Sequence, residues 1–205
     1  MSIFLSLVFG YLIGGIPTGI LVCRLVRGVD PRAFGSGSMG ATNVSRVAGK
    51  GWAVFVLFVD AAKGFLPVKF LAPVLALPTD EVRIACCLAM TVGLVAGHVW
   101  TPYARFRGGK GVATTTGAML ALDPFSVLIA LAVWFIVFLL LRYVSLASIV
   151  AAVVFPVTMF VLHDQPLAYR VAGAILGAFI VFTHRSNIRR LAKGEEKRLF
   201  VKGAS

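Results

Sequence analysis

Residues 124 to 141 read PFSVLIALAVWFIVFLLL, a run of 18 residues that contains no charged side chain. As an α-helix this run would be about 27 Å long, close to the roughly 30 Å hydrocarbon core of a bilayer. A helix that is apolar on every face lies either inside a large protein or in lipid. We therefore interpret this stretch as a membrane-spanning helix.

Comparable runs occupy most of the chain on both sides of this stretch. Two of them are less regular, since the second contains Asp60 and Lys63 and the fourth is short. Pro67, Pro73 and Pro156 should kink or end their helices. The sequence predicts an all-α fold, a polytopic membrane helical bundle with seven transmembrane helices at about 2–23, 51–76, 82–100, 111–122, 124–141, 146–162 and 167–183.

The composition excludes a soluble globular domain. Of the 205 residues, 59% are hydrophobic and 14% are charged, and the mean hydropathy is +0.93. A soluble domain carries about 25% charged residues, and a disordered chain needs low hydrophobicity. The length predicts a single membrane-integral domain over 1–205. Cys23, Cys86 and Cys87 lie in apolar surroundings without a metal-binding spacing, so we expect no metal and no cofactor.

Basic residues define the expected orientation. The chain has 20 Lys and Arg against 8 Asp and Glu, and cytoplasmic loops of membrane proteins retain Lys and Arg. With seven spans and the C-terminus inside, sixteen of the twenty lie on the inner side. Only Lys69, Arg83 and Arg170 lie outside, and Lys63 lies within the membrane. We predict the N-terminus outside and the C-terminus inside, and a six-span arrangement is rejected because it would place basic loops outside.

The inner loops are long and rich in glycine, whereas the outer loops at 77–81, 123–124 and 163–166 are short. The first inner loop, residues 30–46, has closely spaced glycines, whose backbone N–H groups can converge on an anion. Hydroxyls and the guanidinium of Arg46 would add donors suited to phosphate. A flexible loop whose small residues pack helices closely is the alternative. The hydroxyls are those of Ser36, Ser38 and Thr42.

The second inner loop contains Gly108, Gly109, Lys110 and Gly111, which place a cation among bare backbone amides. The spacing of a nucleotide-binding P-loop is absent, so nucleotide hydrolysis is not predicted. His98 precedes this loop at a membrane boundary. It is either a general base, a donor to phosphate or a plain interfacial residue.

Two further pairs of polar residues could carry chemistry. His184 and Asn187 share a helix face at the start of the basic tail, whose cations would otherwise bind anionic lipids. Asp60 and Lys63 can pair across one turn inside the membrane and should face the bundle interior. A transporter would use this pair for ion coupling, and an enzyme would use Lys63 near a phosphate.

Several motifs occur together in the order of one family. They are 35–43 (GSGSMGATN), Asp60 with Lys63-Gly64, His98 with 106–114 (FRGGKGVAT), 145–148 (SLAS) and 184–188 (HRSNI). Nearly the whole chain resembles the bacterial acyl-phosphate:glycerol-3-phosphate acyltransferase family. Ser38-Met39 stands where that family usually has Asn-Ile, and Pro102 lies one position later than usual.

The resemblance implies transfer of a fatty acyl group from acyl phosphate to the 1-hydroxyl of glycerol 3-phosphate, giving 1-acyl-glycerol 3-phosphate and phosphate. It also implies a bacterial cytoplasmic membrane protein with its active site on the cytoplasmic side, and no nucleic acid partner. Its partners would be acyl phosphate, glycerol 3-phosphate and membrane lipid, and a monomer is one of the oligomeric states left open. The expected catalytic residues are His98, Lys110, Arg46, His184 and Asn187. The expected substrate-binding residues are Ser36, Gly37, Ser38, Gly40, Thr42, Asn43, Lys63, Gly108, Gly109, Gly111 and Ser148.

The general base stays open among His98, His184 and a substrate phosphate. Acyl phosphate is already activated, so neither a covalent serine nor a metal is required. The competing interpretations are a small anion transporter and a structural membrane protein whose basic loops only satisfy topology. Against a transporter, the chain has no visible internal repeat and no entry site in its outer loops.

Overall fold

The computed structural model describes residues 1–76, 79–162 and 165–199, and every regular element in these ranges is helical. Parts of the predicted outer loops 77–81 and 163–166, and Lys202 in the tail, lie outside the described residues. The chain forms two compact units, Met1–Leu122 and Asp123–Ser205. The single domain expected over 1–205 stays a prediction.

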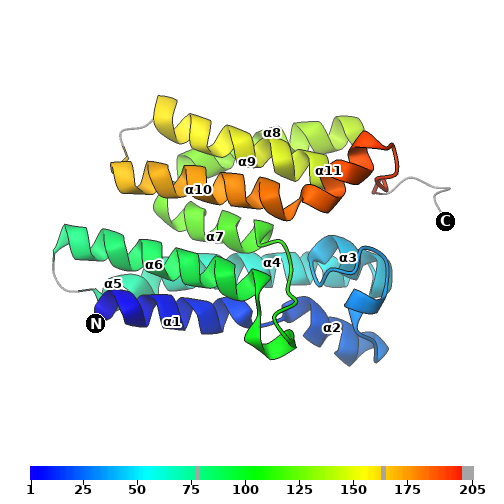
Figure 1. The fold of residues 1–205 in the computed structure, drawn as a ribbon, viewed down its shortest axis with the longest axis horizontal. Coiled ribbons are helices and arrows are strands. Elements are labelled where there is room, and N and C mark those ends of the chain that lie inside the picture. Colours follow the sequence, from blue (N-terminus) through cyan, green and yellow to red (C-terminus); the bar gives the residue numbers. More distant parts are fainter. Residues whose placement is uncertain (77–78, 163–164, 200–205) are drawn as a thin grey trace. The chain divides into compact units, whose positions relative to one another are not determined.

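Unit 1 is built from two pairs of helices, and the two helices of each pair lie side by side (Figure 1). Helix α1 packs along α6, and α4 packs along α7. Two short helices, α2 and α3, follow α1 and bring the chain to α4. The elements are α1 (Ser2–Gly15), α2 (Thr18–Arg27), η1 (Pro31–Ala33), α3 (Ala41–Val47), α4 (Lys50–Leu66), η2 (Pro67–Leu71), α5 (Ala72–Leu75), α6 (Asp80–Val99), η3 (Pro102–Ala104) and α7 (Val112–Leu122).

Glycines set the distance between α1 and α6. A Cβ atom on Gly14 would overlap the backbone of Leu94, and one on Gly97 would overlap the backbone of Tyr11. Small residues of this kind let two membrane helices approach until their backbones touch. The same arrangement recurs where Gly64 of α4 meets the backbone of α7 at Thr114.

The predicted span 2–23 is broken, which the hydropathy pattern did not show. Pro17 has no backbone N–H and disfavours a helical conformation at Ile16, so α1 ends at Gly15 and α2 begins at Thr18. The break frees backbone carbonyl groups. Thr101 donates its hydroxyl to the carbonyl of Gly15, and Lys63 Nζ donates to that of Ile16 at 2.9 Å.

The predicted span 51–76 corresponds to α4, η2 and α5 taken together. Pro67 begins η2, a π-helical turn that runs from Pro67 to Leu71, and α5 ends at Leu75. A π turn is a local widening of an α-helix, and here the proline deforms the helix without ending it. Asp60 and Lys63 lie on the buried side of α4.

Unit 2 contains α8 (Pro124–Leu141), α9 (Val144–Val161), α10 (Leu167–Thr183) and α11 (Arg185–Ala192). Helix α9 packs against both α8 and α10 (Figure 1). These helices coincide closely with the predicted runs 124–141, 146–162 and 167–183. Pro156 lies inside α9, which continues past it to Val161.

Within the described residues, four helical segments are long and apolar enough to cross a membrane, and a fifth is added if the bent pair α10 and α11 counts as one span. The four are Ser2–Arg27, Asp80–Ala104, Pro124–Leu141 and Val144–Val161. Helix α7 has 11 residues, or about 16 Å, so it covers about half of a hydrocarbon core. The count of seven spans therefore stays a prediction.

Candidate functional site

The connection between α2 and α3, residues 28–40 and hereafter loop 1, forms most of the predicted inner loop 30–46 and is organised by a single buried amide. Asn43 Nδ2 lies 2.7 Å from the carbonyl oxygen of Pro31, 2.8 Å from that of Ser38 and 3.1 Å from that of Phe34. Its Oδ1 accepts the backbone N–H of Ser36 at 3.0 Å. The side chain of Asn43, expected to bind substrate, thus holds the loop in shape from within.

The backbone amides of loop 1 are partly committed to the loop itself. The N–H of Gly37 donates to the carbonyl of Phe34, and that of Gly40 donates to Ser38 Oγ. Gly35 and Gly37 have φ values of +58° and +68°, a conformation that favours glycine. Fewer backbone N–H groups are therefore available to bind an anion than the spacing of the glycines predicted. Helix α3, which follows, has only seven residues.

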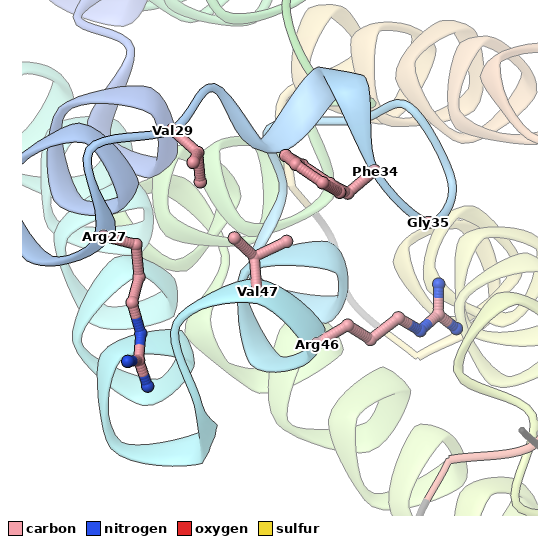
Figure 2. Close-up of a pocket in the computed structure, with 6 residues that line it drawn as sticks. All are labelled: Arg27, Val29, Phe34, Gly35, Arg46 and Val47. Atoms are coloured by element: carbon pink, nitrogen blue, oxygen red, sulfur yellow. The ribbon is translucent and has the colours of Figure 1, made fainter.

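Arg46 reaches an open depression of about 510 Å³ on unit 1. Figure 2 shows its side chain extending from α3 toward the turn at Gly35, with Val47 between it and Arg27 and with Phe34 above them in this view. The guanidinium is exposed, so it is available to an anion from solution. The depression is lined by Arg27, Val29, Phe34, Gly35, Arg46 and Val47.

The second inner loop, residues 100–111 and hereafter loop 2, folds directly over His98. The N–H of Gly109 donates to the carbonyl of His98, and the N–H of Gly108 donates to that of Val99. A Cβ on Gly109 would overlap His98 Nε2, so only glycine allows this approach. His98 is 3% exposed. In this position the imidazole supports the glycine pair that leads into Lys110.

A buried polar network lies beneath loop 2. Lys63 Nζ is 2.8 Å from Asp60 Oδ1, which confirms the pairing expected from their spacing. His98 Nδ1 is 4.0 Å from the same carboxylate oxygen and 3.1 Å from the hydroxyl of Thr114. A buried charge requires a partner, and here each charge has one of opposite sign. The network joins α4, α6 and α7 below the loop.

The two loops are tied together by Arg32. Its Nη1 donates to the carbonyls of Ala104 and Arg107 in loop 2, at 2.8 and 3.1 Å. Its Nε and Nη2 face Asp30 at 3.0 and 2.7 Å. Hydrogen bonding from Arg32 lowers the pKa of Asp30, and the same bond raises the pKa of Arg32. Both groups therefore stay ionised at neutral pH.

Two of the predicted residues of unit 2 have defined partners. Ser148 Oγ donates to the carbonyl of Val144 and accepts the indole N–H of Trp134 at 3.1 Å. His184 Nδ1 lies 2.8 Å from the carbonyl oxygen of Ile180. A carbonyl can only accept, so Nδ1 carries the proton, and in a neutral imidazole Nε2 is the basic nitrogen.

Asn187 participates in a cluster around Glu196. The carboxylate accepts hydrogen bonds from Ser145, Asn187 and Arg190, each at 2.6 Å. Burial opposes the ionisation of Glu196, but these three donors outweigh it and lower its pKa. Glu196 thus folds the tail back onto the start of α9 and fixes the amide of Asn187.

The predicted site residues are divided between the two units. Unit 1 holds both glycine loops, Arg46, Lys63, His98 and Lys110, whereas Ser148, His184 and Asn187 belong to unit 2. The sequence reasoning missed Arg32, Thr114 and Glu196. An acidic residue in a strongly basic segment was the available signal for Glu196 and for Asp30, because such a carboxylate is surrounded by potential partners.

Comparisons with known proteins agree on one family. Residues 4–194 match the family model described as glycerol-3-phosphate acyltransferase. A relative of that name from Desulforudis audaxviator is 40% identical over 97% of this chain and 96% of its own length. Another, from Geotalea daltonii, is 45% identical over 91% and 92% of the two chains.

A solved structure also matches almost the whole chain. It is the crystal structure of PlsY (YgiH), an integral membrane glycerol 3-phosphate acyltransferase, in its glycerol 3-phosphate form. The TM-score is 0.87 at 38% identity, covering 97% of this chain and 96% of that one. The lysophosphatidic acid form of that protein matches with a TM-score of 0.84.

Proposed function

Because the chain belongs to the glycerol-3-phosphate acyltransferase family, we propose that it transfers a fatty acyl group from acyl phosphate to the 1-hydroxyl of glycerol 3-phosphate. Membership makes it an integral membrane acyltransferase of phospholipid synthesis. The acyl phosphate donor, the position of acylation and the product 1-acyl-glycerol 3-phosphate are the proposal.

One observation carries this proposal: two loops with exposed or half-buried cations lie in one compact unit and are tied together by Arg32. Both proposed substrates bring a phosphate, and a suitable cation lies near each loop: Arg46 in α3, directly after loop 1, and Lys110 in loop 2. Arg46 offers a planar fork for phosphate oxygens, and Lys110 offers a compact charge. A fatty chain would stay in the bilayer while its phosphate meets these loops.

The reaction proceeds by direct attack. The 1-hydroxyl oxygen forms an ester bond with the acyl carbon, the bond from that carbon to the phosphate oxygen breaks, and inorganic phosphate leaves. The acyl phosphate is an activated anhydride, so positioning and charge stabilisation suffice. Lys110 and Arg46 offset the charge of the two phosphates. The amides of Gly108 and Gly109 hold loop 2 on α6 and support Lys110, because their N–H groups already have carbonyl partners.

The proton of the attacking hydroxyl goes to His184 Nε2 or to a substrate phosphate. His98 is the weaker candidate for this step because it lies beneath the Gly108-Gly109 backbone. We propose that His98 and Asn43 act through the loops that they hold, and that Lys63 acts through its contacts with Asp60 and with the carbonyl of Ile16 at the break between α1 and α2. The stretch from Gly35 to Thr42, which includes Ser36 and Ser38, would border the bound phosphate. Ser148 stays a proposed substrate-binding residue and Asn187 a proposed catalytic residue.

We further propose seven membrane spans in the bacterial cytoplasmic membrane, with the N-terminus outside and the C-terminus and active site on the cytoplasmic side. The bias of basic residues toward the inner loops supports this orientation.

The decisive experiment uses protein purified in detergent and supplied with an acyl phosphate, glycerol 3-phosphate or both. We expect phosphate release and acylated product only when both are present, with the acyl group on the 1-hydroxyl by NMR. Turnover with an acyl thioester in place of acyl phosphate would overturn the donor assignment. Transport of glycerol 3-phosphate into liposomes without acylation would favour the anion transporter.

A further inference from the structure

Arg32 is shared between two loops that are far apart in the sequence. One nitrogen, Nη1, bonds to the carbonyls of Ala104 and Arg107, which lie 72 and 75 residues away. The remaining edge of the guanidinium lies against the carboxylate of Asp30. Only a planar fork of donors can face a carboxylate and two carbonyls at once. The arrangement therefore requires arginine at position 32.

The two carbonyls that Arg32 binds flank an unusual stretch of backbone. Arg105 and Phe106 both have φ of +57°, a left-handed conformation rare outside glycine. Successive residues of this kind persist only where the surrounding structure holds them. Within loop 2, the N–H of Phe106 donates to the carbonyl of Thr101 at 2.9 Å. Arg32 supplies the restraint from loop 1.

This bend leads directly into the cationic end of loop 2. Arg107 is followed by Gly108, Gly109 and Lys110, and the two glycines rest on the carbonyls of Val99 and His98. Glycine alone would leave the chain free to turn, but these two hydrogen bonds fix Gly108 and Gly109 on α6, so the bend at Arg107 is carried on to Lys110. A restraint on the carbonyl of Arg107 is therefore a restraint on the position of Lys110.

We propose that Arg32, oriented by Asp30, is a positioning residue that couples the two phosphate loops and holds Lys110 in place for acyl transfer. The effect on acyl transfer rests on the proposed function, whereas the coupling of the two loops does not depend on that function.

Arg24 provides a matched control. Its guanidinium is 3.6 Å from the same carboxylate and its side chain is 64% exposed, so Arg24 shares the ion pair with Asp30 but not the bonds that Arg32 makes to loop 2.

Hydrogen exchange without substrate tests the coupling. In Arg32→Ala and Arg32→Lys, we expect the amides of Phe106, Gly108 and Gly109 to exchange at least about tenfold faster, while α8 to α10 keep wild-type rates. Arg24→Ala should match the wild type throughout. If both Arg32 variants fail to fold, Asp30→Asn keeps the guanidinium but loosens its orientation, and smaller changes at the same three amides are expected.

Kinetics test whether the coupling by Arg32 matters for acyl transfer. Both Arg32 variants should lower kcat/KM by at least about tenfold, mainly through the KM of one phosphate substrate. Added guanidinium ion at millimolar concentration should restore part of the activity of Arg32→Ala, whereas tetramethylammonium should not. Unchanged exchange in loop 2, or faster exchange with wild-type kinetics, would overturn the inference. A wild-type protein without turnover would instead refute the proposed function, and the exchange experiment would still judge the coupling.

Discussion

Arg46 and Lys110 are the two cations expected to meet substrate phosphates. Replacing either with alanine should lower kcat/KM by at least about 100-fold, equal to about 2.7 kcal/mol of transition-state stabilisation. Steady-state kinetics on folded protein would measure this loss. Arg83→Ala is the control, because Arg83 pairs with Asp80 at the opposite end of α6 from His98. Near-normal kinetics in both variants would mean that these cations serve topology only.

The two histidines should separate in their effects, since their surroundings differ. His98 is buried under loop 2, so His98→Gln should weaken glycerol 3-phosphate binding and spare part of the rate. His184 directs Nε2 away from the carbonyl that holds Nδ1, so His184→Gln should reduce kcat and leave binding largely intact. Equilibrium binding and kcat, measured for each variant, distinguish the two. Loss of turnover with normal binding in His98→Gln would return His98 to the role of base.

Glu196 should matter for stability more than its place in the tail suggests. Glu196→Gln removes the charge that three donors share, at a cost of about 2–3 kcal/mol. A lower thermal midpoint in detergent at pH 7 is expected, and Glu195→Gln, at an exposed position, should have little effect.

The pH dependence of this effect follows from the lowered pKa of Glu196 in the folded state. Such a carboxylate contributes stability above its usual pKa of 4.5, and the contribution is lost as the pH falls through the lower folded value. The difference in midpoint between wild type and Glu196→Gln should therefore be full at pH 7 and should shrink below about pH 4.5. A difference that does not change with pH would contradict the role of the charge.

At the scale of helices, the contact between α1 and α6 depends on glycine. A Cβ at position 14 would overlap the Leu94 backbone, so Gly14→Ala should force the two helices apart. We expect a loss of about 1–3 kcal/mol, seen as a lower thermal midpoint and a lower yield of folded protein. Gly51→Ala is the matched control, because no atom lies within 4 Å of its added Cβ. It should be neutral or slightly stabilising in α4.

Over the whole molecule, the orientation in the membrane can be tested by labelling. Ser2→Cys should react with an impermeant maleimide from outside intact cells, and Glu195→Cys should react only after the cells are opened. The native cysteines are buried, so they should contribute little background. Labelling of both positions from the same side would contradict an odd number of spans and thus the seven-span topology.

Much of this architecture is determined locally. Long apolar runs form helices because their backbone groups must be satisfied within the segment in lipid, so the ranges 124–141, 146–162 and 167–183 could be predicted closely. The pairing of Asp60 with Lys63 could also be predicted, since residues three apart share a helix face. The break at Pro17 was also visible in the sequence, but hydropathy alone did not reveal it.

Only the tertiary structure decided how the site is supported. Arg32 meets carbonyls 72 and 75 residues away, and Lys63 meets the carbonyl of Ile16 where the first helix breaks. The sequence shows that Asn43 and the loop glycines are important. It does not show that the Asn43 side chain bonds to the backbone of loop 1, or that Gly108 and Gly109 rest on α6. A motif specifies which donors and acceptors are available, whereas their partners depend on which distant backbone groups the packed helices bring within reach.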